Sequence, residues 1–196
     1  YRKDGIIAIK LDDDNELIDV RLTTGGNEVI LVTRNGLSLR FHEEQARSQG
    51  RNTSGVYGIR PSENDCVIGL ALVSDDKKLL VASENGIGKR TPFDDYRLQS
   101  RGGKGVITMK CTDKTGKVVG AAAVSDEDEL MMMTSGGQSI RIRITDVRET
   151  GRNAQGVKLV TLNESESLQD IAPVRSNDEE TEETEETEET EETEET

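Results

Sequence analysis

The sequence repeats itself with a period of about fifty residues, and this period constrains the fold more than any single motif does. Four glycines open short β-like segments at intervals of 50, 50 and 51 residues. They are Gly5, Gly55, Gly105 and Gly156. The period predicts an array of similar units, each of which buries its apolar face against its neighbours.

Each unit contains four segments with the composition of short β-strands. The second segments lie at 16–23, 66–73, 117–124 and 167–174, the third at 28–33, 78–83 and 129–134, and the fourth at 37–41, 87–91 and 139–143. The dipeptides Asn35-Gly36, Asn85-Gly86 and Gly136-Gly137 join third to fourth segments, and such pairs close tight hairpins because they adopt positive φ at low cost. The fourth segments alternate apolar and basic residues, which predicts an outer or edge strand.

Four-stranded units at this period predict an all-β fold of propeller-like blades over residues 1–174, three complete and one partial. Propellers close with about four to eight blades. Either strands from elsewhere complete the fourth blade, or the chain is the C-terminal part of a longer ring. We expect the second, and the chain begins at Tyr1 without a methionine.

Negative charge is concentrated at the C-terminus. The formal net charge is −14, but 13 of the 39 acidic residues lie between Asp178 and Thr196, where there is no Lys or Arg. Residues 1–177 therefore hold 26 acidic and 25 basic residues and are compatible with a polyanionic ligand. The Glu/Thr-rich segment 175–196 is predicted to be a disordered acidic tail, because it has almost no apolar residues to bury.

Two columns of basic residues follow the repeat. The fourth segments carry Arg40, Arg90 and Arg141 at equivalent positions, with Lys89 and Arg143 beside them, and the following loops carry Arg51, Arg101 and Arg152. A rim of regularly spaced arginines suits duplex DNA, which offers one phosphate charge per ~1.7 Å of axis. The alternative interpretation is that these arginines bridge neighbouring blades through Asp or Glu, or are simply solvated.

One loop combines glycines with cations. It reads Gln99, Ser100, Arg101, Gly102, Gly103, Lys104 and Gly105. Three glycines beside two cations allow close approach of the backbone to a phosphate, with the cations as additional donors. The loop fits neither the Walker nor the Rossmann glycine pattern.

The segment QSRGGKG, the strand NGIGKRT at 85–91, and the linkers GRNTSGV at 50–56 and GRNAQGV at 151–157 resemble the C-terminal domain of the A protein of DNA gyrase. The resemblance covers residues 1–174. It implies a β-pinwheel, a propeller variant with strands exchanged between blades, whose basic rim wraps DNA so that strand passage introduces negative supercoils. Two features depart from that family. Ser100 stands where it usually has Arg, and two units precede a box that the family carries in its first blade.

The resemblance also implies the setting. The chain is expected to be a non-catalytic part of an ATP-dependent type II topoisomerase in the bacterial cytoplasm, associated with the nucleoid. The expected partners are double-stranded DNA, the N-terminal region of gyrase A, gyrase B and the chain's own acidic tail. No cofactor is expected in this chain, because other parts of the holoenzyme use ATP and magnesium. No tyrosine stands in a helical domain like the one that holds the DNA-cleaving tyrosine.

Other kinds of site lack the necessary residues. Cys66, Cys111 and His42 have no metal-ligand spacing, and the two thiols are predicted to be reduced and buried. No catalytic triad, carboxylate pair or membrane-length apolar run is present in the sequence. Two alternatives stay open. One is the C-terminal domain of the A-type protein of topoisomerase IV, which keeps no good box, and the other is a protein-binding propeller.

Overall fold

The computed structural model describes residues 6–175, and these residues form β-strands and three single-turn 3-10 helices. The elements are β1 (Glu28–Thr33), β2 (Leu37–His42), η1 (Glu43–Gln45), β3 (Val67–Leu72), β4 (Lys78–Ser83), β5 (Ile87–Pro92), η2 (Phe93–Asp95), β6 (Val106–Ile107), β7 (Val118–Val124), β8 (Glu129–Thr134), β9 (Ser139–Arg143), η3 (Ile144–Asp146), β10 (Val157–Lys158) and β11 (Leu168–Val174). The predicted all-β fold is confirmed. The acidic segment that begins at Asp178 lies outside the described residues.

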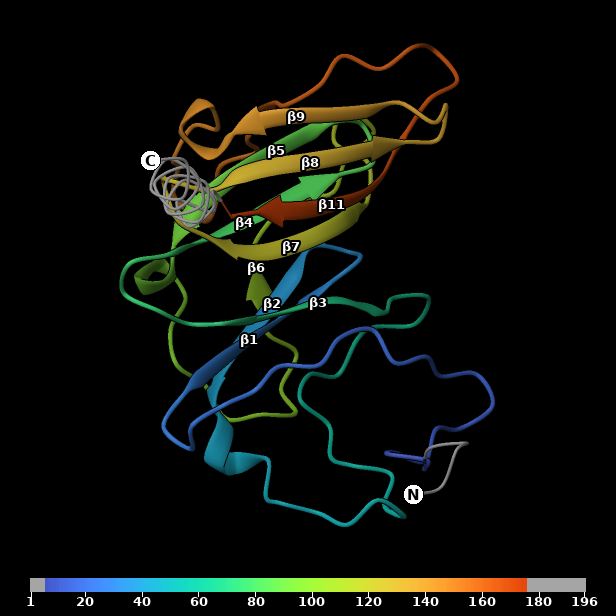
Figure 1. The fold of residues 1–196 in the computed structure, drawn as a ribbon, viewed down its shortest axis with the longest axis vertical. Helices are drawn as coiled ribbons and strands as arrows, with labels where there is room; N and C mark the ends of the chain where they lie inside the picture. Colours follow the sequence, from blue (N-terminus) through green and yellow to red (C-terminus); the bar gives the residue numbers. More distant parts are fainter. Residues whose placement is uncertain (1–5, 176–196) are drawn as a thin grey trace, which may run out of the picture.

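The strands form three antiparallel sheets with a common plan (Figure 1). Their strand orders are β3-β1-β2-β6, β10-β5-β4-β7 and β11-β8-β9. In the first two sheets a tight hairpin forms the two middle strands. On one side it pairs with a strand, β3 or β7, that we call the inner strand, and β11 is its equivalent in the third sheet. Gly36, Gly86 and Gly137 close the three hairpins with φ of 80°, 71° and 79°, as the turn dipeptides predicted.

Each blade contains strands from different repeats. The two-residue strand β6 pairs with β2, with Ile107 opposite Leu37, although more than one repeat separates them. The strand β10 pairs with β5 in the same way. This is the exchange that the resemblance implied. As a consequence β2 and β5 lie inside their sheets, so the prediction of an edge strand is wrong for them and correct for β9.

Two of the three buried hydrophobic clusters in the described residues lie between consecutive blades. The inner strands β3, β7 and β11 pack side by side through small residues, since a Cβ placed on Gly120 would overlap Cγ1 of Ile171. One buried cluster joins the first and second blades, and another joins the second and third. Two 3-10 turns contribute anchors to these clusters: Phe93 and Tyr96 to the first, and Ile144 and Val147 to the second. Each blade is therefore stabilised mainly by the next one.

Three predicted strands are irregular in the structure, namely 6–10, 16–23 and 55–60. Most of their apolar side chains are exposed, among them Ile7 at 79%, Leu22 at 93% and Tyr57 at 67%, whereas Ile59 is buried. The long loops at the bottom of Figure 1 are these regions. The equivalents of 6–10 and 55–60 in later units are β6 and β10, each of which pairs with a hairpin strand about seventy residues earlier. The equivalents of 16–23 are β3, β7 and β11, each of which pairs with a hairpin strand about forty residues earlier. Among the described residues, no strand lies at these offsets before the three irregular segments.

The two cysteines are free thiols, as predicted, but they are not both buried. Cys66 is exposed and Cys111 is half-buried, because Cys66 directly precedes β3 at the end of a turn. Within residues 6–175 no helix has the length and apolar character that a membrane crossing requires.

Candidate nucleic-acid interface

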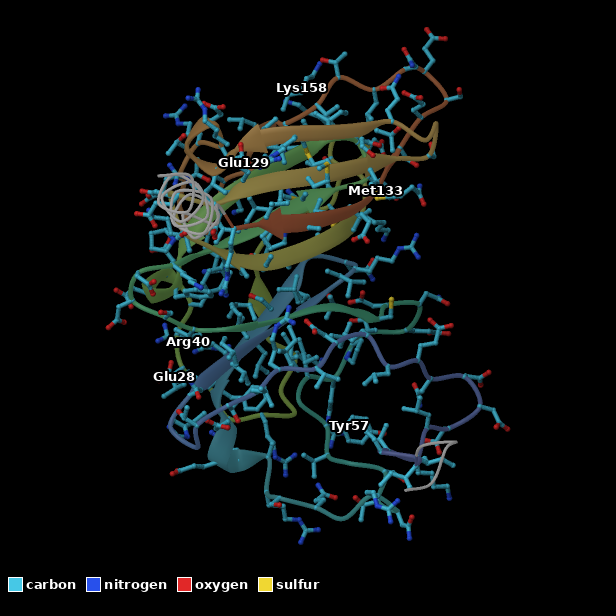
Figure 2. The ribbon with its side chains drawn as sticks, viewed as in Figure 1. Glu28, Arg40, Tyr57, Glu129, Met133 and Lys158 are labelled. Carbon is cyan, nitrogen blue, oxygen red and sulfur yellow. The ribbon has the colours of Figure 1, made fainter. Side chains whose placement is uncertain are left out.

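Arg40 on β2 connects the first blade to the second. Its Nε donates to Oε2 of Glu28 at 2.5 Å, and its Nη1 donates to the carbonyls of Phe93 at 2.7 Å and Tyr96 at 3.3 Å. Those two carbonyls frame η2 of the next blade. The Arg40 side chain is only 16% exposed, and Figure 2 shows it beside Glu28. It is therefore a clamp between blades.

Arg90 on β5 makes the equivalent clamp one repeat later. Its Nε donates to the carbonyl of Val147 at 2.7 Å, and its Nη1 is bound to Asp126. Lys78 also binds Asp126, and together with Arg90 it lowers the pKa of that carboxyl below its ordinary value. The interpretation that these arginines bridge blades thus describes both Arg40 and Arg90.

The third member of this column, Arg141, has a different environment. It pairs with Glu129 and is 53% exposed, because no following 3-10 turn lies against β9 in the described chain. Arg143 is 72% exposed and pairs with Asp146 at 3.3 Å. The same sequence position is therefore largely shielded from solvent in two blades and accessible in the last.

Lys89 is completely buried, so a direct phosphate contact by this residue is not supported. Its Nζ donates to the carbonyls of Gly151 at 3.2 Å and Arg152 at 2.5 Å. Burial lowers the pKa of Lys89 to about 8, the nearby Arg152 contributes to this lowering, and Asp95 acts in the opposite direction. Lys89 therefore holds the linker that leads to β10.

The second predicted column, Arg51, Arg101 and Arg152, makes one contact in every repeat. In each case Nη1 donates to the carbonyl of the second residue after the preceding repeat glycine. The acceptors are Ile7 at 3.3 Å, Tyr57 at 3.1 Å and Ile107 at 2.5 Å. Each guanidinium thus attaches a linker to the first segment of the unit before it.

The glycine-rich loop is an ordered part of the boundary between two blades. Its first residue, Gln99, is half-buried and donates its N–H to the carbonyl of Arg40 at 2.9 Å. The Nε of Arg101 donates to the carbonyl of Gln45 at 2.6 Å. Gly102 donates to the carbonyl of Gly58 at 2.5 Å.

Two glycines of the loop are required by its geometry. Gly102 and Gly105 have φ of 74° and 80°. A Cβ on Gly105 would overlap the backbone oxygen of Ser38. The carbonyl of Gly103 accepts the N–H of Arg60 at 2.9 Å. With the backbone fixed in this way, Lys104 is exposed and makes no hydrogen bond or ion pair with any residue from 6 to 175.

Sequence reasoning overlooked a third basic column. Arg47, Arg97 and Arg148 follow the three 3-10 turns at intervals of 50 and 51 residues, and all three are exposed. The regular spacing was the available signal. No ion pair in the described range involves them.

The accessible cations suit a ligand with spaced negative charges. Exposed guanidinium and ammonium groups bind phosphate oxygens by charge-assisted hydrogen bonds. Among residues 6–175, no three His, Cys, Asp or Glu side chains lie together so that they could hold a metal ion.

A family profile described as "DNA gyrase C-terminal domain, beta-propeller" matches residues 1–24, 27–74, 77–125 and 128–175. The last three stretches each contain one hairpin and the inner strand that pairs with it. Three strands of each sheet therefore come from a single matched stretch.

Several curated relatives are gyrase A proteins of bacteria. The chain is 55% identical over 179 residues to that of Halalkalibacterium halodurans and 48% identical over 179 residues to that of Clostridium acetobutylicum, covering 91% of this chain and 22% of the relative in both cases. It is 43% identical over 184 residues to that of Escherichia coli K12, covering 92% of this chain and 21% of the relative. The chain therefore spans about a fifth of the length of these relatives.

Two solved structures share the fold. The structure of a DNA gyrase A C-terminal domain matches with a TM-score of 0.79 at 30% identity, over 88% of this chain and 59% of that one. The C-terminal domain of DNA topoisomerase IV matches with a TM-score of 0.84 at 25% identity, over 93% of this chain and 57% of that one. Both domains thus share the arrangement of blades described above.

Proposed function

Because the chain belongs to the family of DNA gyrase C-terminal β-propeller domains, we propose that it binds duplex DNA and bends it along the outer edge of its blades. Residues 1–174 serve as the blade array and residues 175–196 as an acidic tail. In the holoenzyme the bend directs strand passage toward negative supercoiling. DNA cleavage, ATP and magnesium belong to the N-terminal region of gyrase A and to gyrase B, in the cytoplasm and at the nucleoid.

The observation that supports this proposal most directly is the construction of the glycine-rich loop. Arg101 is attached to Gln45 and Tyr57, and the glycines hold the loop against β2, so the backbone is fixed before any ligand arrives. Lys104 projects from this fixed backbone without a partner among the described residues. An ordered loop that displays a free ammonium loses little entropy on binding a phosphate.

The basic residues separate into two roles. Arg40, Arg90 and Lys89 hold blades and a linker together, so they support the interface from inside. The proposed DNA-contacting set is Gln99, Arg101, Gly102, Gly103, Lys104, Gly105, Arg141, Arg143, Arg51 and Arg152.

Bending DNA requires many contacts of this kind. Bending 20–30 bp smoothly by 40–90° costs on the order of 1–6 kcal/mol. Several phosphate contacts must therefore act together, and a repeated blade provides the same contact more than once. Phosphate contacts carry little sequence information, so the binding is expected to tolerate many sequences.

The acidic tail is proposed to compete with DNA. It carries 12 Glu between Asp178 and Thr196 and is covalently tethered to the blades. Tethering gives it a high effective concentration near any cationic surface that it reaches. This would weaken DNA binding most strongly at low salt, where charge interactions are least screened.

Gyrase is favoured over topoisomerase IV as the setting. The topoisomerase IV domain superposes slightly better, but its identity is 25%, whereas curated gyrase A relatives reach 55%. The loop QSRGGKG also favours gyrase, since the topoisomerase IV family keeps no good box.

The test is a mobility shift over a salt series with duplexes of about 25 bp and about 150 bp, since the shorter one is too short to follow the edge of several blades. We expect tighter binding to the longer duplex. Lys104→Gln should reduce the slope of log affinity against log salt by about 0.9. Lys114→Gln, an exposed lysine on the turn before β7, is the matched control.

Absence of a shift with both duplexes would contradict DNA binding and favour a protein-binding propeller. A shift without any length preference would contradict wrapping.

A further inference from the structure

The third basic column occupies one fixed position in every repeat. Arg47, Arg97 and Arg148 each follow the residue that closes a 3-10 turn. In the second and third repeats that residue is Tyr96 or Val147, which is at most 1% exposed. Its N–H donates to the first carbonyl of the turn at 2.9 or 3.0 Å. A buried and hydrogen-bonded residue therefore fixes the backbone from which Arg97 or Arg148 projects into solvent.

These arginines do not hold the fold together. No ion pair within residues 6–175 involves them, and the only hydrogen bond that their side chains make there is from Nη2 of Arg97 to Oε1 of Gln99 at 3.5 Å. The other two columns bind backbone carbonyls or carboxylates, and the contacts of Arg141 differ from those of Arg40 because the neighbouring blade differs. The third column is exposed in all three repeats, which a role in joining blades would not produce.

The nearby carboxylates have other partners. Glu43 accepts the N–H of Asn27 at 2.6 Å, and Asp95 accepts the N–H of Arg152 at 3.0 Å. Asp146 pairs with Arg143. The positive charge of the third column is thus not neutralised by a direct ion pair from its own turn.

The third column marks the boundaries between blades. The segment after Arg97 lies parallel to β2, with a bridge between Arg40 and Leu98. The segment after Arg148 lies parallel to β5, with a bridge between Arg90 and Glu149. The same cation therefore recurs at two successive boundaries, and Arg97 stands seven residues before Lys104 on one continuous segment.

We propose that Arg47, Arg97 and Arg148 are phosphate-contacting residues that carry the duplex from one blade to the next. This inference rests on the proposed DNA binding and adds to its contacts three residues that lie outside the two columns that the repeat first indicated. Anchored turns present one guanidinium per blade, which matches the regular charge of a duplex backbone.

The test compares two double variants with equal loss of charge in the 196-residue chain. Arg97→Gln with Arg148→Gln should lower the slope of log affinity against log salt concentration by about 1.8. At 0.1 M salt this weakens DNA binding by up to about sixtyfold. The control, Arg34→Gln with Lys114→Gln, removes two exposed cations that do not recur with the repeat and should change the slope by less than about 0.5. Arg97→Lys with Arg148→Lys keeps both charges and should retain the wild-type slope.

Each outcome decides the matter. A reduced slope in the Gln variant alone supports the inference. An unchanged slope in that variant, or an equal loss in the control, overturns it while DNA binding by the wild type stands. If the wild-type chain binds no duplex, the proposed function fails, and the inference fails with it. Thermal unfolding midpoints within about 2 °C of the wild type would show that the variants remain folded.

Discussion

The clamp between blades allows a test within one molecule, because three equivalent arginines differ in their surroundings. Arg90 donates to the carbonyl of Val147 and binds Asp126, Arg40 donates to two carbonyls beside η2, and Arg141, itself 53% exposed, binds only the half-buried carboxylate of Glu129. Replacing each by Gln removes the guanidinium at the same repeat position. The predicted loss of stability therefore follows the neighbouring blade and not the sequence.

The size of the effect can be estimated from these contacts. Hydrogen bonds made by a charged donor to buried carbonyls contribute about 1.5–3 kcal/mol. The Asp126 carboxylate is 54% exposed, so its ion pair adds only about 0.2–1 kcal/mol. Arg90→Gln should thus lower the free energy of unfolding by about 2–4 kcal/mol, and Arg40→Gln by a similar amount. Arg141→Gln, in a pair whose guanidinium is 53% exposed, should cost less than about 1 kcal/mol.

The assay is urea-induced unfolding followed by far-UV circular dichroism, with the free energy obtained by linear extrapolation. An unchanged m-value would show that the variants unfold in the same way as the wild type. The clamp reasoning is refuted if Arg141→Gln destabilises the chain as much as Arg90→Gln does, or if Arg90→Gln changes the free energy by less than about 0.5 kcal/mol.

Three further predictions concern the linker, the loop and the tail. Gly105→Ala should lower the free energy of urea unfolding by about 2–4 kcal/mol, because the new methyl group would overlap the backbone oxygen of Ser38 at a residue that also has a positive φ. Gly55→Ala is the control, because Gly55 has a φ of 77° but open space around it, and it should cost only about 1–2 kcal/mol. The pKa of Lys89 is about 8 in the folded chain and 10.5 ordinarily, so between these pH values the unfolded chain binds more protons than the folded chain. The free energy of unfolding should therefore rise with pH, by up to about 1.4 kcal/mol per pH unit from pH 8 to 9.5. Lys89→Met should abolish this rise, and an equal rise in the variant would exclude Lys89 as its source. Truncation after Asn177 should tighten DNA binding at low salt, and identical affinities across a salt series would show that the tail does not compete.

The repeat and the hairpins could be predicted from the sequence because they depend on local chemistry, and the family could be predicted because its motifs can be read directly in the sequence. An Asn-Gly or Gly-Gly pair adopts positive φ wherever it stands, and alternating apolar residues form a strand once any partner is available. All three hairpins accordingly lie where the turn dipeptides placed them. The charge distribution also separated an acidic tail from a nearly neutral body.

The partner of each strand, in contrast, depends on the packing of the whole chain. Val56 and Val106 share a repeat position, but only Val106 is in a strand, since β2 lies at the required offset from it. Strand exchange covers more than one repeat, so the outcome at any position depends on residues far away in the chain.

The same reason explains the arginines. Arg40 and Arg141 have similar neighbours in sequence, yet one is clamped to carbonyls of the next blade and the other is half exposed. A guanidinium serves as a clamp or remains free for phosphate according to whether a distant turn brings carbonyls within hydrogen-bond distance. Periodicity located the cations, and the packing of one blade against the next determined which of them face solvent.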